Sequence, residues 1–224
     1  MVYLISIEGN IGSGKSTLVH QLKKYYKDNK FVYFLDEPVS EWVEIKDENG
    51  VDILTKFYSE TKKYAFSFQM MAYITRIHML RKAIRENPNC IFITERSVYT
   101  DKNIFAQMLY DDGMISNIDF DIYNRWFYEF AEVHDVSIIY VNTSYDKCNE
   151  RIKKRNRKGE VISLEYLKRC GDYHNSWLKN NKYKILEFDG NGDKDLSDKN
   201  VYLDWIKKIN VFIAKNMCNK QIDL

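Results

Sequence analysis

A glycine-rich loop near the N-terminus has the residue types and spacing that suit it to hold a polyphosphate. Residues 9–16 read GNIGSGKS and match the pattern G-x-x-x-x-G-K-S/T. Glycines let a backbone fold closely around phosphates with its N–H groups pointing inward. In this pattern, Lys15 would reach the outer phosphates and the Ser16 hydroxyl would ligate Mg²⁺. We therefore expect a nucleoside triphosphate here, the alternative being an ordinary glycine-rich turn before a helix.

Charged residues follow two further strand-like runs of the sequence. Glu37 precedes Pro38 at the end of KFVYFLDEP, and Glu95 and Arg96 end CIFITER. A carboxylate beside a phosphate site can hold Mg²⁺ or accept a proton, and an arginine can neutralise the charge of a moving phosphoryl group. The alternative for Glu95 and Arg96 is a surface ion pair at the start of a helix. Three strand ends with such groups favour a functional site.

Five short runs rich in Ile, Val, Phe and Tyr alternate with longer amphipathic stretches. Strands buried on both faces have this composition, and their alternation with helices predicts an α/β fold. We expect an open parallel five-stranded sheet with helices on both faces, which brings the charged strand ends to one edge. No segment resembles a linker, so we interpret residues 1–224 as a single domain. The predicted strands are 2–7, 30–36, 90–95, 137–143 and 183–189, and the helical stretches are 15–28, 59–86, 99–134, 145–180 and 199–217.

The composition narrows the class of protein. The chain has 224 residues, a net charge of +2 and 45% hydrophobic residues, which is typical of a globular domain. It has no apolar run that could span a membrane and no N-terminal pattern of a secretory signal. The near-balanced charge gives no reason to expect nucleic acid as a partner. Four widely spaced cysteines without metal-ligand spacing favour a reducing, cytoplasmic compartment.

Two helical segments carry further polar groups. In FSFQMMAYITR, Gln69, Ala72, Tyr73 and Arg76 share one helical face. A buried amide and guanidinium need polar partners; a nucleobase edge would supply them, and a solvated face or a structural acid is the alternative. The basic run RIKKRNRKGE suits a solvated helix, a nucleic-acid patch, or a lid that closes arginines over phosphates.

The chain resembles the cellular deoxynucleoside kinases, the family that includes deoxycytidine and deoxyguanosine kinases. The resemblance rests on IEGNIGSGKST, EPVSEW, FSFQMMAYITR, ERSVYTDKNIF and RIKKRNRKGE…LEYL, which follow one another in family order. It implies a P-loop kinase fold with a basic lid at about 151–162. It also implies an enzyme that transfers the γ-phosphate of ATP, or of another nucleoside triphosphate, to the 5′-hydroxyl of a deoxynucleoside. Mg²⁺ as cofactor, a role in nucleotide salvage and a homodimer are further implications.

The resemblance also implies roles for individual residues in phosphoryl transfer. Glu37 resembles the general base that takes the proton of the 5′-hydroxyl, and Arg96 resembles the arginine beside the 5′-oxygen. Lys15 is expected at the phosphates, and Ser16 and Glu95 at the metal. The expected nucleotide-binding residues are Gly9, Asn10, Ile11, Gly12, Ser13, Gly14, Lys15, Ser16, Thr17, the lid arginines Arg151, Arg155 and Arg157, and Asp193 beside the donor base.

The acceptor site is assigned by the same resemblance. Gln69 resembles the glutamine that reads the base, and Arg76 with Asp101 resembles the pair that contacts the base in members preferring cytidine or purines. Tyr58 and Glu160 resemble the residues that bind the sugar 3′-hydroxyl. The apolar walls are expected from Trp42, Leu54, Phe68 and Phe105.

Three functions stay open at this point. A nucleoside monophosphate kinase, such as a thymidylate kinase, shares the fold and the glycine loop, and a non-enzymatic P-loop regulator is a further alternative. Glu37 followed by Pro38 and Val39 favours a hydroxyl acceptor, because a carboxylate would repel an acceptor phosphate. Arg76 and Asp101 favour deoxycytidine, deoxyguanosine or deoxyadenosine over thymidine without choosing among them.

Overall fold

The chain folds around one five-stranded parallel sheet with the strand order β2-β3-β1-β4-β5. The structure is a computed structural model that describes residues 2–131, 136–157, 160–179, 183–192 and 199–222. Each predicted strand lies within two residues of an observed one, so the prediction of an open parallel five-stranded sheet is confirmed. The strands are β1 (Tyr3–Glu8), β2 (Val32–Leu35), β3 (Ile91–Glu95), β4 (Val136–Asn142) and β5 (Lys184–Asp189).

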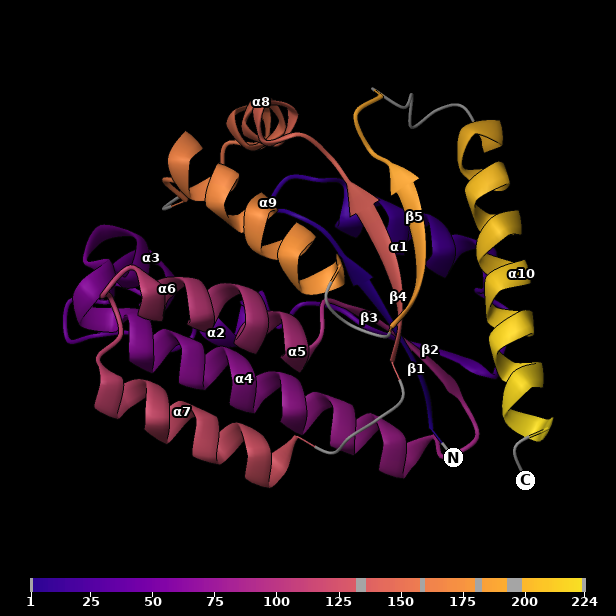
Figure 1. Cartoon of the computed structure of the whole chain (residues 1–224), viewed down its shortest axis with the longest axis horizontal. Coiled ribbons are helices and arrows are strands. Elements are labelled where there is room, and N and C mark those ends of the chain that lie inside the picture. Colours follow the sequence, from indigo (N-terminus) through magenta and orange to yellow (C-terminus); the bar gives the residue numbers. More distant parts are fainter. Residues whose placement is uncertain (1, 132–135, 158–159, 180–182, 193–198, 223–224) are drawn as a thin grey trace.

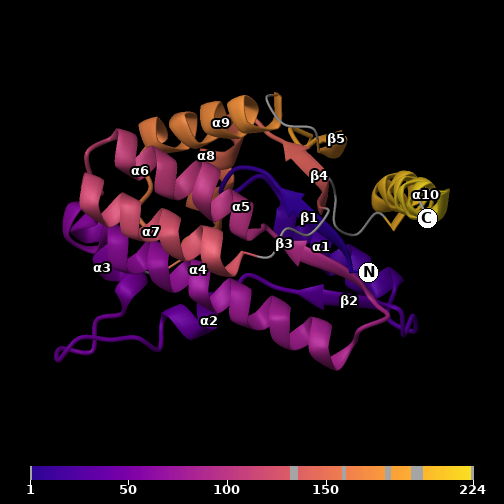
Figure 2. The ribbon, with the colours of Figure 1, turned by 60° about the horizontal axis from the view of Figure 1, so that its bottom comes forward.

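Helices cover both faces of the sheet, as predicted. In Figure 1, α1 and α10 lie on one side, while α4, α5 and α9 lie on the other, and Figure 2 shows the same separation. On the second side, α7 packs along α4 as an outer helix, and the Tyr73 hydroxyl donates to the Trp126 carbonyl at 2.9 Å. These helices are α1 (Lys15–Tyr25), α4 (Thr61–Glu86), α5 (Val98–Thr100), α7 (Asn117–Phe130), α9 (Leu164–Lys179) and α10 (Lys199–Ile222).

The central strand β1 is buried along its whole length. Its side chains alternate between the two layers because successive residues of a strand point to opposite faces. Ile5 and Ile7 pack in the core with α1 and α10, whereas Leu4 packs in the core beneath α4 and α9. Ser6 and Glu8 continue the side of Leu4, so two polar residues stand where the pattern calls for apolar ones.

Two predicted helical stretches are interrupted. The described part of the predicted stretch 99–134 divides into α5, the π-helix η1 (Asp101–Ala106), α6 (Gln107–Asp111) and α7, with a turn before α7 at Gly113, whose φ is +68°. The stretch 145–180 divides into α8 (Tyr145–Arg155) and α9, because Asn156 ends α8 at a left-handed φ of +47°. Two short helices were not predicted, α2 (Val39–Trp42) and α3 (Ile53–Ser59). Among the helices described here, none combines the length and hydrophobicity that a membrane span needs.

Candidate active site

The glycine loop connects β1 to α1 at the carboxyl end of the sheet. Gly9, Gly12 and Gly14 have φ values of +145°, +80° and +103°, which side chains rarely allow. A Cβ atom added to Gly12 would also lie 2.6 Å from the carbonyl oxygen of Cys148. Because Gly14 is the N-cap of α1, the loop presents the positive end of that helix to the site.

Lys15 is the first residue of α1 and is only 4% exposed. Its Nζ donates a hydrogen bond of 2.8 Å to the Asn10 carbonyl across the loop. Burial, with a further contribution from the positive charge of Arg96, lowers the pKa of Lys15 to about 8. The loop therefore holds a buried ammonium group, which a phosphate dianion would stabilise.

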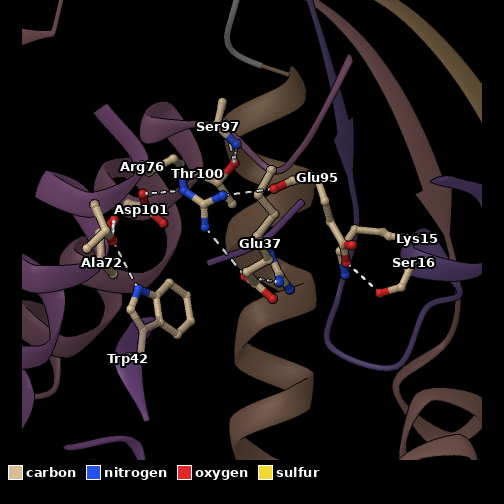
Figure 3. Close-up of polar contacts among 12 residues, drawn as sticks. Lys15, Ser16, Glu37, Trp42, Ala72, Arg76, Glu95, Ser97, Thr100 and Asp101 are labelled. Atoms are coloured by element: carbon tan, nitrogen blue, oxygen red, sulfur yellow. Dashed lines mark hydrogen bonds and ion pairs between the residues drawn. The ribbon is translucent and has the colours of Figure 1, made fainter. Parts of the chain in front are cut away.

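Two carboxylates stand opposite the loop at the ends of β2 and β3. Glu95 Oε1 accepts a hydrogen bond of 2.6 Å from the Ser16 hydroxyl, and Glu37 Oε1 accepts one of 2.9 Å from Arg96 Nη1 (Figure 3). Burial raises the pKa of Glu37, but the charges of Arg96, Arg76 and Lys15 outweigh it and lower that pKa to about 2. Glu37 is therefore an ionised carboxylate held between cations.

Arg76 of α4 donates hydrogen bonds to three acidic residues of the site, Glu37, Glu95 and Asp101. Its Nε donates to Asp101 Oδ2 at 2.9 Å, its Nη1 to the Glu95 carbonyl at 2.8 Å, and its Nη2 to Glu37 Oε1 at 3.4 Å (Figure 3). Both Arg76 and Asp101 are buried. Asp101 begins the π-helix η1, a form of helix frequent at functional sites. One guanidinium thus fixes the relative positions of Glu37 and Asp101.

A cavity of about 480 Å³ extends from the glycine loop to α3 and α4. Its inner end is walled by aromatic rings: Phe68 stacks on Phe57 at 4.6 Å between ring centroids and meets Trp42 edge-on at 5.4 Å. Gln69 is 2% exposed, and its Oε1 has no hydrogen-bond partner among the described residues. With Asp101, it offers polar contacts at the end of an apolar slot, as pockets for small planar ligands do.

The basic segment formed by the second half of α8 and the residues that follow it lines the other side of the cavity. Arg155 Nη2 lies 2.6 Å from both carboxylate oxygens of Glu160, and Arg157 Nη1 lies 3.9 Å from Glu160 Oε1. Arg151 donates to the carbonyls of Ser13 and Gly192 at 3.2 and 3.0 Å. Of the predicted lid, residues 158–159 lie outside the described residues, as does Asp193, which the resemblance assigns to the donor base.

The structure brings the predicted site residues together. Within the described ranges, all of them line the cavity except Gly9, Asn10, Ser13 and Arg76, and each of these four hydrogen-bonds to a residue that does.

Sequence reasoning gave no site role to five residues that line the cavity: Val39, Phe57, Ala72, Lys154 and Tyr166. Val39 and Tyr166 lie within EPVSEW and LEYL, motifs that carry the resemblance but predict no role for these two residues. Phe57 belongs to α3, a helix that was not predicted.

The donor set of Ser16 and Glu95 fits Mg²⁺. Both supply oxygen atoms, which this hard cation prefers, and they already touch each other. In the described part of the chain, no three His, Cys, Asp or Glu side chains gather into a closed metal site. Mg²⁺ typically keeps several waters and binds through one or two protein groups plus substrate phosphates, so a small donor set is the expected one.

Comparisons with known proteins agree with this geometry. The family model described as "Deoxynucleoside kinase" matches residues 5–214. The chain is 36% identical to the probable deoxycytidine kinase of fowlpox virus (strain NVSL), over 94% of this chain and 88% of that protein. It is 31% identical to the deoxycytidine kinase of Homo sapiens, over 94% and 90% of the two chains. It is also 31% identical to the mitochondrial thymidine kinase 2 of Homo sapiens, over 78% of this chain and 64% of that protein. The chain therefore belongs to the deoxynucleoside kinase family of phosphotransferases.

Proposed function

We propose that this enzyme transfers the γ-phosphate of ATP, or of another nucleoside triphosphate, to the 5′-hydroxyl of deoxycytidine or a purine deoxynucleoside. One observation carries the proposal: a single cavity holds the glycine loop with Lys15, the ion pair of Glu37 with Arg96, and the apolar slot that ends at Gln69. A phosphate donor and a nucleoside fit at opposite ends of this cavity, with the carboxylate between them.

The transfer is direct. The 5′-oxygen forms a bond to the γ-phosphorus while the bond from that phosphorus to the bridging oxygen breaks, and a nucleoside diphosphate leaves. Glu37 receives the hydroxyl proton, for which it must be ionised, and its pKa of about 2 meets that condition. The loose transition state of phosphoryl transfer makes the hydroxyl proton leave late, so a weak base suffices. Lys15 and Arg96 offset the charge that develops on the phosphoryl oxygens.

Ser16 and Glu95 would hold Mg²⁺ next to the phosphates. When bound, the metal supplies charge neutralisation at the β- and γ-oxygens of the donor. Glu95 is 7% exposed and keeps its carboxylate turned toward Ser16 through the 2.6 Å contact. The contact between Ser16 and Glu95 therefore fixes the two oxygen donors that would hold the metal beside the glycine loop.

Base preference follows from the groups at the end of the slot. Gln69 can accept from and donate to the edge of a base, and the Asp101 carboxylate can only accept. The exocyclic amino group of cytosine, adenine or guanine would donate to Asp101, whereas thymine has no such group and would turn its O4 carbonyl toward the carboxylate, which repels it. Two of the relatives above are named deoxycytidine kinases, which agrees with this preference.

The sugar and the donor meet at the lid. Tyr58 and Glu160 line the cavity together, where they would bind the 3′-hydroxyl, and burial raises the pKa of Tyr58, so its hydroxyl stays a donor. Arg151, Arg155 and Arg157 would meet the donor phosphates from the lid side. Closure of such a lid excludes water and limits hydrolysis of the donor.

We also propose a homodimer through the outer surface of α7 and α4. Ile118, Ile122 and Trp126 follow one another every four residues on α7 and are 74%, 39% and 45% exposed. Ile74 of α4 is 47% exposed and lines the same groove as Trp126. Sedimentation velocity should give twice the chain mass, and Trp126→Asp should shift it to the monomer.

Three thiols of the described residues, Cys90, Cys148 and Cys170, are free. Free thiols persist in reducing compartments, which supports the cytoplasm as the location of this enzyme.

An acceptor panel tests the proposed reaction. Each of the four deoxynucleosides, together with deoxycytidine and thymidine monophosphates, is incubated with labelled ATP and Mg²⁺, and the products are separated. We expect label on deoxycytidine or a purine deoxynucleoside and none on the monophosphates. Transfer to monophosphates alone would support a monophosphate kinase, and triphosphate binding without any transfer would support a regulator.

A further inference from the structure

A fully buried carboxylate lies behind the site and outside the cavity. Glu8, the last residue of β1, is 0% exposed and does not line the cavity. Its Oε1 accepts hydrogen bonds from the hydroxyls of Ser6, Ser97 and Thr100, at 2.5, 3.1 and 2.6 Å. Its Oε2 has no partner among the described residues.

A buried carboxylate with an unpaired oxygen destabilises the fold, because its removal from water is not fully compensated. Three hydroxyl donors compensate one oxygen of Glu8 and leave the other uncompensated. An apolar residue on this side of β1 would continue the core that Leu4 begins, without that destabilisation.

Two of the three hydroxyls belong to the turn of residues 96–101, which follows β3 and includes α5. Ser97 and Thr100 also form the capping box of α5, in which the Ser97 backbone N–H donates to Thr100 Oγ1 at 3.2 Å (Figure 3). The residue before Ser97 is Arg96, and the residue after Thr100 is Asp101. Glu8 therefore binds the turn that lies between Arg96, proposed for phosphoryl transfer, and Asp101, proposed for base recognition.

The backbone at Arg96 explains why the turn needs support. Its φ is +62°, in the left-handed region that residues with a side chain rarely adopt. Its N–H donates to the Ile7 carbonyl at 3.0 Å, next to Glu8 in β1, and its guanidinium reaches Glu37. The negative charge of Glu8 also contributes to raising the pKa of Arg96.

We propose that Glu8 is a positioning residue for phosphoryl transfer, whose buried carboxylate locks the turn from Arg96 to Asp101 in its strained conformation. It touches neither substrate and acts through Arg96 on the moving phosphoryl group. This inference rests on the proposed function of Arg96, and its test includes a measurement that does not depend on substrate.

The three hydroxyls supply the test. Thr100→Val removes a donor that belongs to the turn while keeping the side-chain shape. Ser6→Ala removes a donor to the same oxygen that belongs to β1, and so serves as the matched control. Glu8→Gln keeps an acceptor oxygen and removes the charge. Each variant is measured for thermal unfolding, for kcat and KM, and for amide hydrogen exchange of residues 96–101.

We expect Thr100→Val and Glu8→Gln to lower kcat by about 10- to 100-fold, as displaced supporting groups do, with a smaller change in the KM for ATP. Exchange in residues 96–101 should accelerate in both. Ser6→Ala should lower the unfolding temperature without changing kcat or that exchange. If Glu8→Gln does not fold, Thr100→Val alone decides.

A double-mutant cycle separates positioning through Arg96 from general stabilisation. Glu8→Gln combined with Arg96→Lys should lose little more kcat than Arg96→Lys alone, because the two residues act as one unit. If the fold-losses in kcat of the two single variants multiply in the double variant, the proposal is wrong. It is also wrong if folded Thr100→Val has the kcat of the wild type and the same rate of amide hydrogen exchange in residues 96–101. A wild-type enzyme that phosphorylates no deoxynucleoside, with the exchange results as expected, would instead refute the proposed function.

Discussion

Replacing Glu37 by Gln tests the group on which the proposed chemistry depends. The substitution keeps the size of the side chain and an oxygen that can accept from Arg96 Nη1, now 2.9 Å away. It removes the negative charge and the ability to take a proton. Among the described strand ends that line the cavity, the other carboxylate is that of Glu95, which accepts a hydrogen bond from Ser16.

The expected size of the effect has two parts. Loss of a positioned general base lowers a rate by about 10²- to 10⁴-fold, and we expect kcat to fall within that range. Loss of the charge also removes stability. The pKa of Glu37 lies at about 2 instead of the ordinary 4.5, a difference equivalent to roughly 3 kcal/mol of net interaction with its cations. A depressed pKa adds stability that is complete above pH 4.5 and is lost as pH falls toward 2, so the variant should be less stable at pH 7.

The assay separates these parts. Steady-state rates with deoxycytidine and ATP give kcat and both KM values, and urea unfolding at pH 7 gives the free energy of unfolding. Glu41→Gln, an exposed acid on the adjacent short helix, is the matched control and should leave both unchanged. We expect Glu37→Gln to change the KM for the nucleoside far less than kcat, because the proton is transferred only in the transition state.

Near-normal turnover by a folded Glu37→Gln enzyme would refute the reasoning. So would a wild-type kcat/KM profile that loses activity with an apparent pKa near 4.5 and that Glu37→Gln flattens. In that case the carboxylate would titrate as a free acid, and the cations beside it would not hold it ionised.

Three further predictions concern pH, the glycine loop and the base. Burial lowers the pKa of His174 to about 3, so on acidification this side chain takes up its proton in the unfolded chain before it does so in the folded protein. Between pH 6.5 and 5 the free energy of unfolding, measured by urea titration, should therefore fall by about 2 kcal/mol. His174→Phe should abolish this dependence on pH, and His78→Gln, at an exposed histidine, should retain it. Gly12→Ala should weaken ATP binding at least tenfold by calorimetry, whereas Gly50→Ala, at a similar φ of +76° but with nothing within 4 Å, should lose only stability. Asp101→Asn should lower the ratio of kcat/KM for deoxycytidine to that for thymidine by about tenfold or more in competition assays, and an unchanged ratio would contradict its role at the base.

The sheet was predictable because β1, β3 and β4 are largely buried on both faces, which gives them a nearly continuous apolar composition. The edge strands β2 and β5 are more exposed but have a similar composition. The interruption of the stretch 99–134 was not predictable, because η1 is stabilised by contacts that are distant in sequence. Asp101, its first residue, is bound by Arg76 of α4, and Ile104 packs in the core beneath the sheet. Hydrophobic periodicity is read over windows of about 11–18 residues. The six residues of η1 are therefore too few for the sequence pattern to distinguish a π-helix from an α-helix.

The candidate site was predictable where chemistry demands particular residue types, as in the glycine loop and the acid before Pro38. Glu8 was overlooked because the sequence shows it only as one letter of a motif. A signal was nevertheless present: Leu4, Ser6 and Glu8 alternate on one side of a strand whose other side is apolar, so a charged residue stands at a core position. Two of its three hydroxyl partners, Ser97 and Thr100, lie about ninety residues away, and only the fold identifies them.

The three hydrogen bonds that Arg76 donates to Asp101, Glu95 and Glu37 have a consequence for the evolution of this enzyme. The side chain that steadies Asp101, which we propose at the nucleobase, also contacts Glu37, which we propose at the reacting hydroxyl. Any replacement at position 101 that invites a new base therefore disturbs the proton acceptor through one guanidinium. Nucleobase choice and catalytic speed are in this way inherited together. Descendants with altered preference should carry paired substitutions, the first beside the base and the second restoring the support of Glu37.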